Sequence, residues 1–126
     1  MREALSPPGF PPASGPYSPT IKVGNMLFLS GSIPMDLATG QMVTGDITEQ
    51  ATRVMENIKA LLQSAGADFR HVVKSTVFLA DMNEFAAMNA VYATYFAAPY
   101  PARSTVQVAR LPRDCRLEIE VIAVLD

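Results

Sequence analysis

Two charged side chains in the last quarter of the chain are the strongest candidates for chemistry. Arg103 lies in the run Pro101-Ala-Arg-Ser-Thr, and Glu118 lies in the later run Leu117-Glu-Ile-Glu-Val. A guanidinium matches a carboxylate with two parallel N–H donors, and a nearby carboxylate can position or deprotonate a water molecule. The segment 101–124 therefore predicts two strands joined by a polar turn at 111–114, with a carboxylate-binding cation at its entrance and a base on its return.

Both residues also have a purely structural interpretation. Arg103 would suit a surface or interface ion pair with Glu118 or Glu120 of a neighbouring chain. Glu118 and Glu120 point to the same face of a strand, because side chains alternate along it. At least one of these two glutamates is therefore expected to have a structural partner.

The composition is that of one domain with few surface charges. The 126 residues are 49 % apolar and 17 % charged, and the net charge is -2. This length predicts a single domain over residues 1–126. So sparse a set of charges indicates that partners cover part of the surface. The lack of clustered Lys and Arg argues against nucleic acid or an anionic membrane as a partner.

Cysteine and histidine are too scarce for the common metal sites. Cys115 and His71 are the single residues of their types, which excludes an internal disulfide and disfavours a zinc or non-haem iron site. The first residues show no signal-peptide pattern, and no window reaches the roughly 20 apolar residues of a membrane span. A reducing cytoplasm is the expected location.

The first third of the chain predicts a leader and a pair of strands. Residues 1–14 are a proline-rich leader that we expect to lie along the body, and six of the ten prolines fall in residues 6–19. Strands are expected at 21–23 and 26–33, with a further short extended piece at 41–43. The small residues Ser30-Gly31-Ser32 mark either a β-bulge or a close approach of another group.

Two amphipathic helices are predicted. Apolar residues recur every three or four positions over 47–65, after the N-cap candidate Asp46 and before the stop signal Gly66. A second apolar and aromatic stripe predicts a helix over 84–98, closed by Pro99.

The remaining apolar runs predict strands at 71–80, 104–110 and 116–125. Two helices and six strands favour a two-layer α+β domain, with a mixed six-stranded sheet and both helices on one face. In residues 117–125 both alternating sets are mainly apolar, which is typical of a strand buried on both sides. We therefore expect a homo-oligomer that packs through its sheets.

Several segments together resemble one protein family. They are Gly15-Pro-Tyr-Ser18, Gly24-Asn-Met26, Ser30-Gly-Ser-Ile-Pro34, residues 57–66, residues 74–81, Pro101-Ala-Arg-Ser104, Val108-Ala-Arg-Leu-Pro112 and Glu118-Ile-Glu-Val-Ile-Ala-Val124. In this order, from about residue 15 to the C-terminus, they are similar to the RidA/YjgF family of imine deaminases. Arg103 together with Glu118 resembles the catalytically competent branch of that family.

The resemblance implies a chorismate-mutase-like fold and a homotrimer with active sites in clefts between subunits. It also implies hydrolysis of 2-iminopropanoate and 2-iminobutanoate to 2-oxo acids and ammonia, without a metal or an organic cofactor. Arg103 would hold the substrate carboxylate and Glu118 the attacking water. Both would work only where a neighbouring chain closes the cleft with Tyr17 or Asn89.

The same resemblance implies a set of substrate-binding residues. The pocket would be lined by Tyr17, Ser30, Gly31, Ile33 and Asn89, and the backbone carbonyl of Thr105 would accept a hydrogen bond from the imine nitrogen. Asn89 equally suits a helix cap or a core hydrogen bond. Close family members commonly carry cysteine at the position of Thr105. Because the implied contact is through the backbone, we expect activity to persist with an altered pocket.

Other functions stay open at this point. A trimer of the same fold could bind a small carboxylate without catalysis, or act as a chaperone or translation inhibitor through ribonuclease activity. The sparse basic charge argues against the RNA version. A third alternative keeps the chemistry and changes the substrate to an enamine of aminoacrylate or aminomuconate type.

Overall fold

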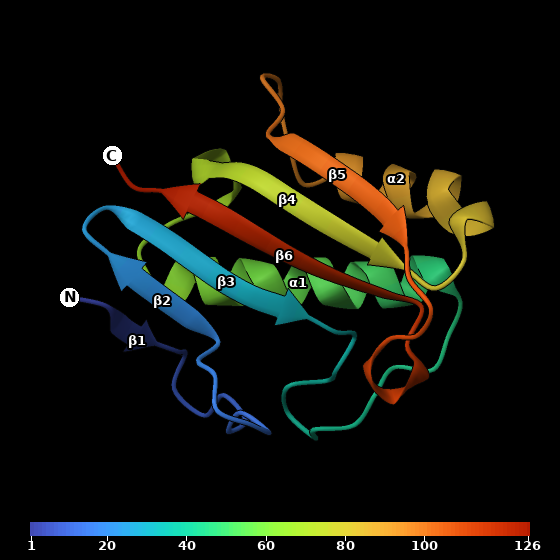
Figure 1. Cartoon of the computed structure of the whole chain (residues 1–126), viewed down its shortest axis with the longest axis horizontal. Helices are drawn as coiled ribbons and strands as arrows, with labels where there is room; N and C mark the ends of the chain where they lie inside the picture. The colour runs from blue at the N-terminus through green and yellow to red at the C-terminus, as the bar shows by residue number, and fades with distance from the viewer.

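The computed structural model describes all residues from 1 to 126 and has two layers, a six-stranded sheet and two helices behind it (Figure 1). The helices are α1 (Ile47–Ser64) and α2 (Phe85–Ala93). The strands are β1 (Glu3–Leu5), β2 (Thr20–Val23), β3 (Met26–Ser32), β4 (Val72–Leu79), β5 (Ala102–Gln107) and β6 (Leu117–Val124). Their order in the sheet is β1-β2-β3-β6-β4-β5.

The sheet is mixed, as the sequence predicts. Strands β4 and β5 run parallel, and every other neighbouring pair is antiparallel. Parallel neighbours need a crossover connection, and α2 supplies it between β4 and β5. The predicted α+β class with both helices on one face is confirmed.

The core lies between the sheet and α1. Every second residue of β6 points to the helices and is at most 3 % exposed, namely Leu117, Ile119, Val121 and Ala123. They meet the apolar stripe of α1, of which Val54, Ile58 and Leu62 are fully buried. Removing one such aliphatic side chain from water contributes about 1.5–3 kcal/mol. This packing anchors β6 and therefore the strand that carries Glu118.

Helix α1 follows its sequence signals. The Asp46 carboxylate accepts a hydrogen bond from the Glu49 backbone N–H at 2.9 Å, which satisfies a free donor of the first turn. The helix ends just before Gly66, whose φ of 78° is the left-handed conformation that glycine adopts without strain. Both expected helix boundaries are confirmed.

Strands β5 and β6 do not form the expected hairpin. Strand β4 lies between them, pairing with β5 on one side and with β6 on the other. The burial patterns explain the order. Four residues of β5 are exposed, which suits the edge of the sheet, whereas β6 has four fully packed core residues and suits its centre.

Helix α2 is shorter than its sequence pattern suggests. A one-turn 3-10 helix at Met82–Glu84 precedes it, and it ends at Ala93 instead of reaching residue 98. Beyond its end the Thr94 hydroxyl donates to the Val91 carbonyl at 2.7 Å. Tyr95 and Phe96 then continue the apolar stripe outside the helix, with both rings against Phe69.

The sixth strand comes from an unexpected place. Glu3–Leu5, inside the proline-rich leader, forms β1 and pairs with β2. The extended piece expected at 41–43 forms only an isolated bridge between Met35 and Met42. The leader is therefore an edge of the sheet before it becomes a loop.

The face of the sheet away from the helices carries exposed apolar side chains. Met26, Phe28 and Val106 are 37 %, 39 % and 43 % exposed. Phe28 lies opposite Ile122 of β6 in the register of the sheet, so this apolar surface continues across neighbouring strands. No segment of the chain lies over this face in Figure 1. The expectation that a second copy covers it stays a prediction.

Candidate active site in two halves

Glu118 lies beside a β-bulge in β3. Leu29 pairs with Val121 and Ser32 with Ile119, so the two residues Ser30 and Gly31 stand opposite one residue of β6. A side chain on Gly31 would collide with the Glu118 carboxylate. The two interpretations of this small-residue segment therefore both hold, because the bulge is also the place where the glutamate approaches the backbone.

The bulge also holds the leader. The Ser30 hydroxyl donates to the Ser18 carbonyl at 2.7 Å, and the Ser30 backbone N–H donates to the Pro19 carbonyl at 2.9 Å. These two bonds tie down the segment that carries Tyr17, whose side chain is 54 % exposed. Ser30 is thus a support for Tyr17 as well as a lining residue.

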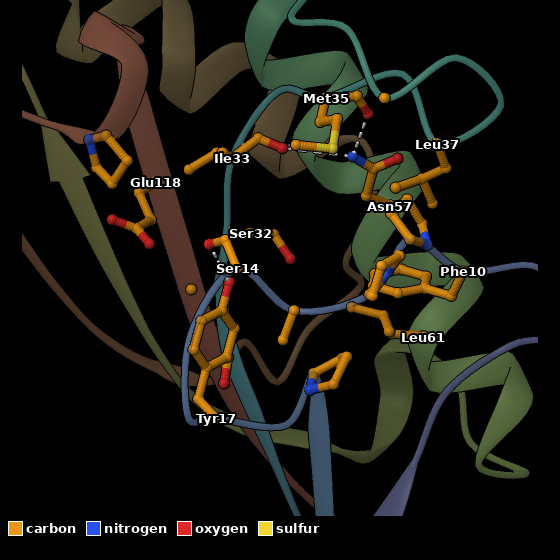
Figure 2. Close-up of a pocket in the computed structure, with 18 of the residues that line it drawn as sticks. Phe10, Ser14, Tyr17, Ser32, Ile33, Met35, Leu37, Asn57, Leu61 and Glu118 are labelled. Carbon is orange, nitrogen blue, oxygen red and sulfur yellow. Dashed lines mark hydrogen bonds between the residues drawn. The ribbon is translucent and has the colours of Figure 1, made fainter.

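A cavity of about 740 Å³ opens in front of Glu118. It lies between the leader, the end of β3, the side of α1 and the turn at Pro112. Figure 2 shows Glu118 and Tyr17 on one side of this cavity and Leu61 on the other. Of the residues expected in the site, the cavity is lined by Tyr17, Ser30, Gly31, Ile33 and Glu118.

Asn57 of α1 braces one wall of the cavity. Its side chain is 3 % exposed, and its amide donates to the Met35 carbonyl at 2.8 Å and to the Ile33 carbonyl at 3.4 Å (Figure 2). The Nε of Arg53 donates to the Asn57 carbonyl oxygen at 3.1 Å. This buried amide fixes the segment that follows the bulge. Asn57 therefore belongs to the wall of the site, although the sequence indicated it only as the first residue of the family-like segment 57–66.

The Glu118 carboxylate has no protein partner. It makes no ion pair, and no hydrogen bond from another residue reaches it. Burial, and secondarily the negative charge of Glu120, raise the pKa of this carboxyl above its ordinary value. A free carboxylate with a raised pKa can accept a proton from a water molecule more readily than an ordinary glutamate.

Arg103 lies on β5 and faces α2. It pairs in register with Ser75 of β4, and its Nη1 donates to the Asn89 side-chain oxygen at 2.8 Å. Its Cζ is 4.7 Å from the centroid of the Tyr92 ring and 5.5 Å from that of Phe85. The guanidinium makes no ion pair, so most of its N–H donors are available to an anion from outside the chain.

Thr105 is on the same side of β5 as Arg103, two residues further on. Its hydroxyl oxygen is buried and has no hydrogen-bond partner. Strand β5 is an edge strand, and half of the backbone groups of such a strand have no partner within the sheet. An edge position suits the backbone contact that the family resemblance implies for Thr105.

The expected residues fall into two separate groups within one chain. Leu117 and Ile119 point to the helices, so Glu118 lies on the opposite face of the sheet, whereas Arg103 points to α2 on the helix side. The cavity next to Glu118 contains neither Arg103, Asn89 nor Thr105. We name the groups the glutamate half (Tyr17, Ser30, Gly31, Ile33, Glu118) and the arginine half (Asn89, Arg103, Thr105).

Comparison with known proteins decides the family. The family described as Endoribonuclease L-PSP matches residues 9–125, almost the whole chain. The chain belongs to this RidA/YjgF family.

Individual relatives agree over nearly their full lengths. A RutC family protein of Pyrococcus horikoshii is 52 % identical, with 98 % of each chain covered. A protein of Mus musculus named 2-iminobutanoate/2-iminopropanoate deaminase is 45 % identical, covering 98 % of this chain and 92 % of the relative. A crystal structure from Thermotoga maritima superimposes with a TM-score of 0.95 at 48 % identity, covering 100 % and 99 % of the two chains.

RidA/YjgF membership suggests a protein that binds small molecules. Two further properties of the structure bear on its site. No group of three or more His, Cys, Asp or Glu side chains is placed to hold a metal ion. Neither helix combines the length and apolar character needed to cross a lipid bilayer.

In this RidA/YjgF chain Phe85 and Tyr92 lie against Arg103, and Ser75 contacts Tyr92, but none of the three was expected in the site. For Phe85 and Tyr92 the sequence did carry a signal. Phe85, Asn89 and Tyr92 are spaced by four and three positions, which places them on one face of α2. That spacing could have linked Tyr92 and Phe85 to Asn89. Ser75 could not have been found in this way, because its contact with Tyr92 spans two elements.

Proposed function

We propose that this RidA-family chain hydrolyses 2-imino acids, and the enamines in equilibrium with them, to 2-oxo acids and ammonia. The names of the mammalian relatives give the substrate class, 2-iminopropanoate and 2-iminobutanoate. One observation in the structure supports it most. The two charged residues of the site, Arg103 and Glu118, each lack a protein counter-charge and are each partly shielded from water.

The chemistry needs only these two groups and a backbone acceptor. Arg103 binds the substrate carboxylate through a bidentate pair of hydrogen bonds. The Thr105 carbonyl accepts a hydrogen bond from the imine N–H and so orients the C=N bond. Glu118 holds a water molecule next to C2 and takes its proton as the C–O bond forms.

The second half of the reaction returns that proton. Glu118 protonates the nitrogen of the tetrahedral intermediate. As the C–N bond breaks, the hydroxyl gives its proton to the Glu118 carboxylate and the electrons of its O–H bond form the carbonyl; Glu118 then passes this proton to the departing ammonia. One water is consumed, and one 2-oxo acid and one ammonia are released. A protonated imine is already electrophilic, so a site with few catalytic groups suffices.

The site would be closed by two copies of the chain. The glutamate half and the arginine half lie on opposite faces of one sheet, so one molecule cannot present both to one substrate. A homotrimer in which the arginine half of one subunit meets the glutamate half of the next would form three complete sites. The exposed apolar face of the sheet supports this assembly, since its Phe28 and Val106 would be buried by neighbouring sheets.

Activity is tested with imines generated in place by an amino-acid dehydratase or oxidase, because free imines decay in water. We expect the protein to accelerate release of the 2-oxo acid well above the buffer rate. Equal rates with and without the protein would contradict the function. Binding of a 2-oxo acid without turnover would instead favour a non-catalytic carboxylate-binding trimer.

Mixed trimers test the shared site directly. Arg103→Ala and Glu118→Gln homotrimers are each expected to be inactive. After the two variants are unfolded, mixed in equal amounts and refolded, about a quarter of the clefts should combine an intact Arg103 with an intact Glu118. Activity should recover to about that share of the wild-type value. Failure to recover, with mixed trimers confirmed by mass spectrometry, would place both residues in one subunit's site.

A further inference from the structure

We propose that Phe85, Asn89 and Tyr92 form a neutral cradle on α2 that positions the Arg103 guanidinium for the substrate carboxylate. All three are positioning residues that act through Arg103. Their role rests on the proposed function of Arg103. This arrangement also changes the expected role of Asn89 from a substrate ligand to a support of the arginine.

The geometry of the cradle comes from one helix face. Phe85, Asn89 and Tyr92 are spaced by four and three residues and so project to the same side of α2. Two aromatic rings lie within 4.7 Å and 5.5 Å of the Arg103 Cζ, and the Asn89 oxygen accepts from its Nη1 at 2.8 Å. An aromatic face within about 6 Å attracts a cation through its quadrupole.

Ser75 holds the cradle in place through Tyr92. The Tyr92 hydroxyl and the Ser75 hydroxyl are 2.6 Å apart, and Ser75 is fully buried on β4. Ser75 is also the residue that pairs with Arg103 in the sheet register. The same serine therefore lies next to the Arg103 backbone in the sheet and holds the Tyr92 ring that lies under the guanidinium. Burial raises the pKa of the Tyr92 phenol, which keeps the ring neutral in the physiological range.

The absence of a carboxylate from the cradle matters for binding. A glutamate or aspartate against Arg103 would occupy its parallel N–H donors and would have to be displaced by the substrate. Aromatic faces and one amide oxygen hold the cation through Nη1 alone, which leaves the N–H groups of Nε and Nη2 to match a carboxylate. Asn89 is committed to this task, because its acceptor oxygen already takes a hydrogen bond from Nη1.

Two tyrosines of this region give a matched experiment. Tyr92 and Tyr95 are both hydrogen-bonded through their hydroxyls, Tyr92 to Ser75 and Tyr95 to Glu56, and both pack in the aromatic cluster around Phe69 and Phe96. Only Tyr92 faces Arg103. Tyr92→Leu should therefore alter the arginine half, and Tyr95→Leu should serve as the control for loss of an aromatic ring in the cluster.

The first readout is the NMR signal of the Arg103 side chain. The Nε–H resonance is assigned by its disappearance in Arg103→Lys. In the unmodified protein we expect ring currents to displace it from the position of a free arginine. Tyr92→Leu should return it toward that position, and Tyr95→Leu should leave it unchanged. An unshifted resonance in the wild type, or the same response to both leucine variants, would overturn the cradle.

The second readout separates binding from chemistry. In Tyr92→Leu we expect the KM for the imino acid to rise about tenfold with kcat within about twofold, because a loosely held guanidinium weakens carboxylate binding. A fall in kcat with unchanged KM would overturn the role. If Tyr92→Leu does not fold, Phe85→Leu carries the same expectations. Should the wild type hydrolyse no imine, the proposed function fails, and the NMR comparison still decides the cradle.

Discussion

The glutamate half and the arginine half hold their charged groups by different means. Glu118 of β6 lies against backbone, beside the β-bulge of β3 whose Gly31 leaves room for the carboxylate, and no side chain bonds to it. Arg103 is surrounded by side chains, two aromatic rings and an amide, on a helix and a strand joined through Ser75.

The difference fits the roles that we propose for the two groups. A base must exchange protons with water, and a hydrogen bond from a neighbouring donor would stabilise the carboxylate and lower its pKa. A carboxylate-binding cation must hold one orientation, and fixed neutral neighbours provide this while leaving most of its donors unoccupied. The glutamate half should therefore be sensitive to steric changes in the backbone, and the arginine half to loss of side chains.

Removal of Arg103 is expected to have the largest effect. Arg103→Ala should lower kcat/KM by about a thousandfold, because a shielded charge pair with the substrate carboxylate is lost. Arg110→Ala is the matched control, since Arg110 forms an exposed pair with Asp114 outside the site. Steady-state kinetics with an imine-generating enzyme measures both. Similar losses in the two variants would mean that Arg103 has no special role.

Gly31→Ala tests the backbone character of the glutamate half. The new methyl group would displace the Glu118 carboxylate, and a shift of about 1 Å can cost about a hundredfold in rate. We expect kcat to fall by that order. Gly15→Ala introduces the same methyl group with only ordinary contacts to the Tyr17 ring and should leave the rate nearly unchanged. Normal activity in Gly31→Ala would show that Glu118 tolerates displacement.

Ser30→Ala should have a moderate effect through the leader. It removes the 2.7 Å hydrogen bond to the Ser18 carbonyl, a contact worth about 1 kcal/mol. Tyr17 should become more mobile and the KM should rise about fivefold. Limited proteolysis within residues 10–19 should also speed up. An unchanged cleavage rate together with an unchanged KM would mean that the backbone bond to Pro19 alone holds the leader.

Glu120→Gln should produce the smallest change, a displacement of the pH profile. Burial and the Glu120 charge raise the pKa of Glu118, so the active carboxylate is lost as pH falls through that raised value. Removing the Glu120 charge lowers the pKa of Glu118, and the acidic limb of kcat should move to lower pH. Glu3→Gln makes the same charge change on β1 and should not move it. A shift to higher pH would contradict the coupling.

Local sequence signals predicted much of the fold. The Asp46 cap, the spacing of apolar residues in α1 and Gly66 act within a few residues of one another, so the helix could be bounded from sequence. The sequence pattern predicts too long a helix for α2, because Tyr95 and Phe96 keep the helical spacing. In the structure the chain has already left the helix at these residues, and both rings pack on Phe69. The order of strands depends on long-range pairing, which local patterns do not encode.

The sequence by itself determined the family and the two candidate site residues, since Arg103 and Glu118 lie in recognisable segments. The tertiary structure decided their separation. Insertion of β6 between β3 and β4 places Glu118 on one face of the sheet while Arg103 turns to α2 on the other. It also decided which neutral groups surround the guanidinium, because Ser75, Phe85 and Tyr92 meet only when β4 and α2 pack together.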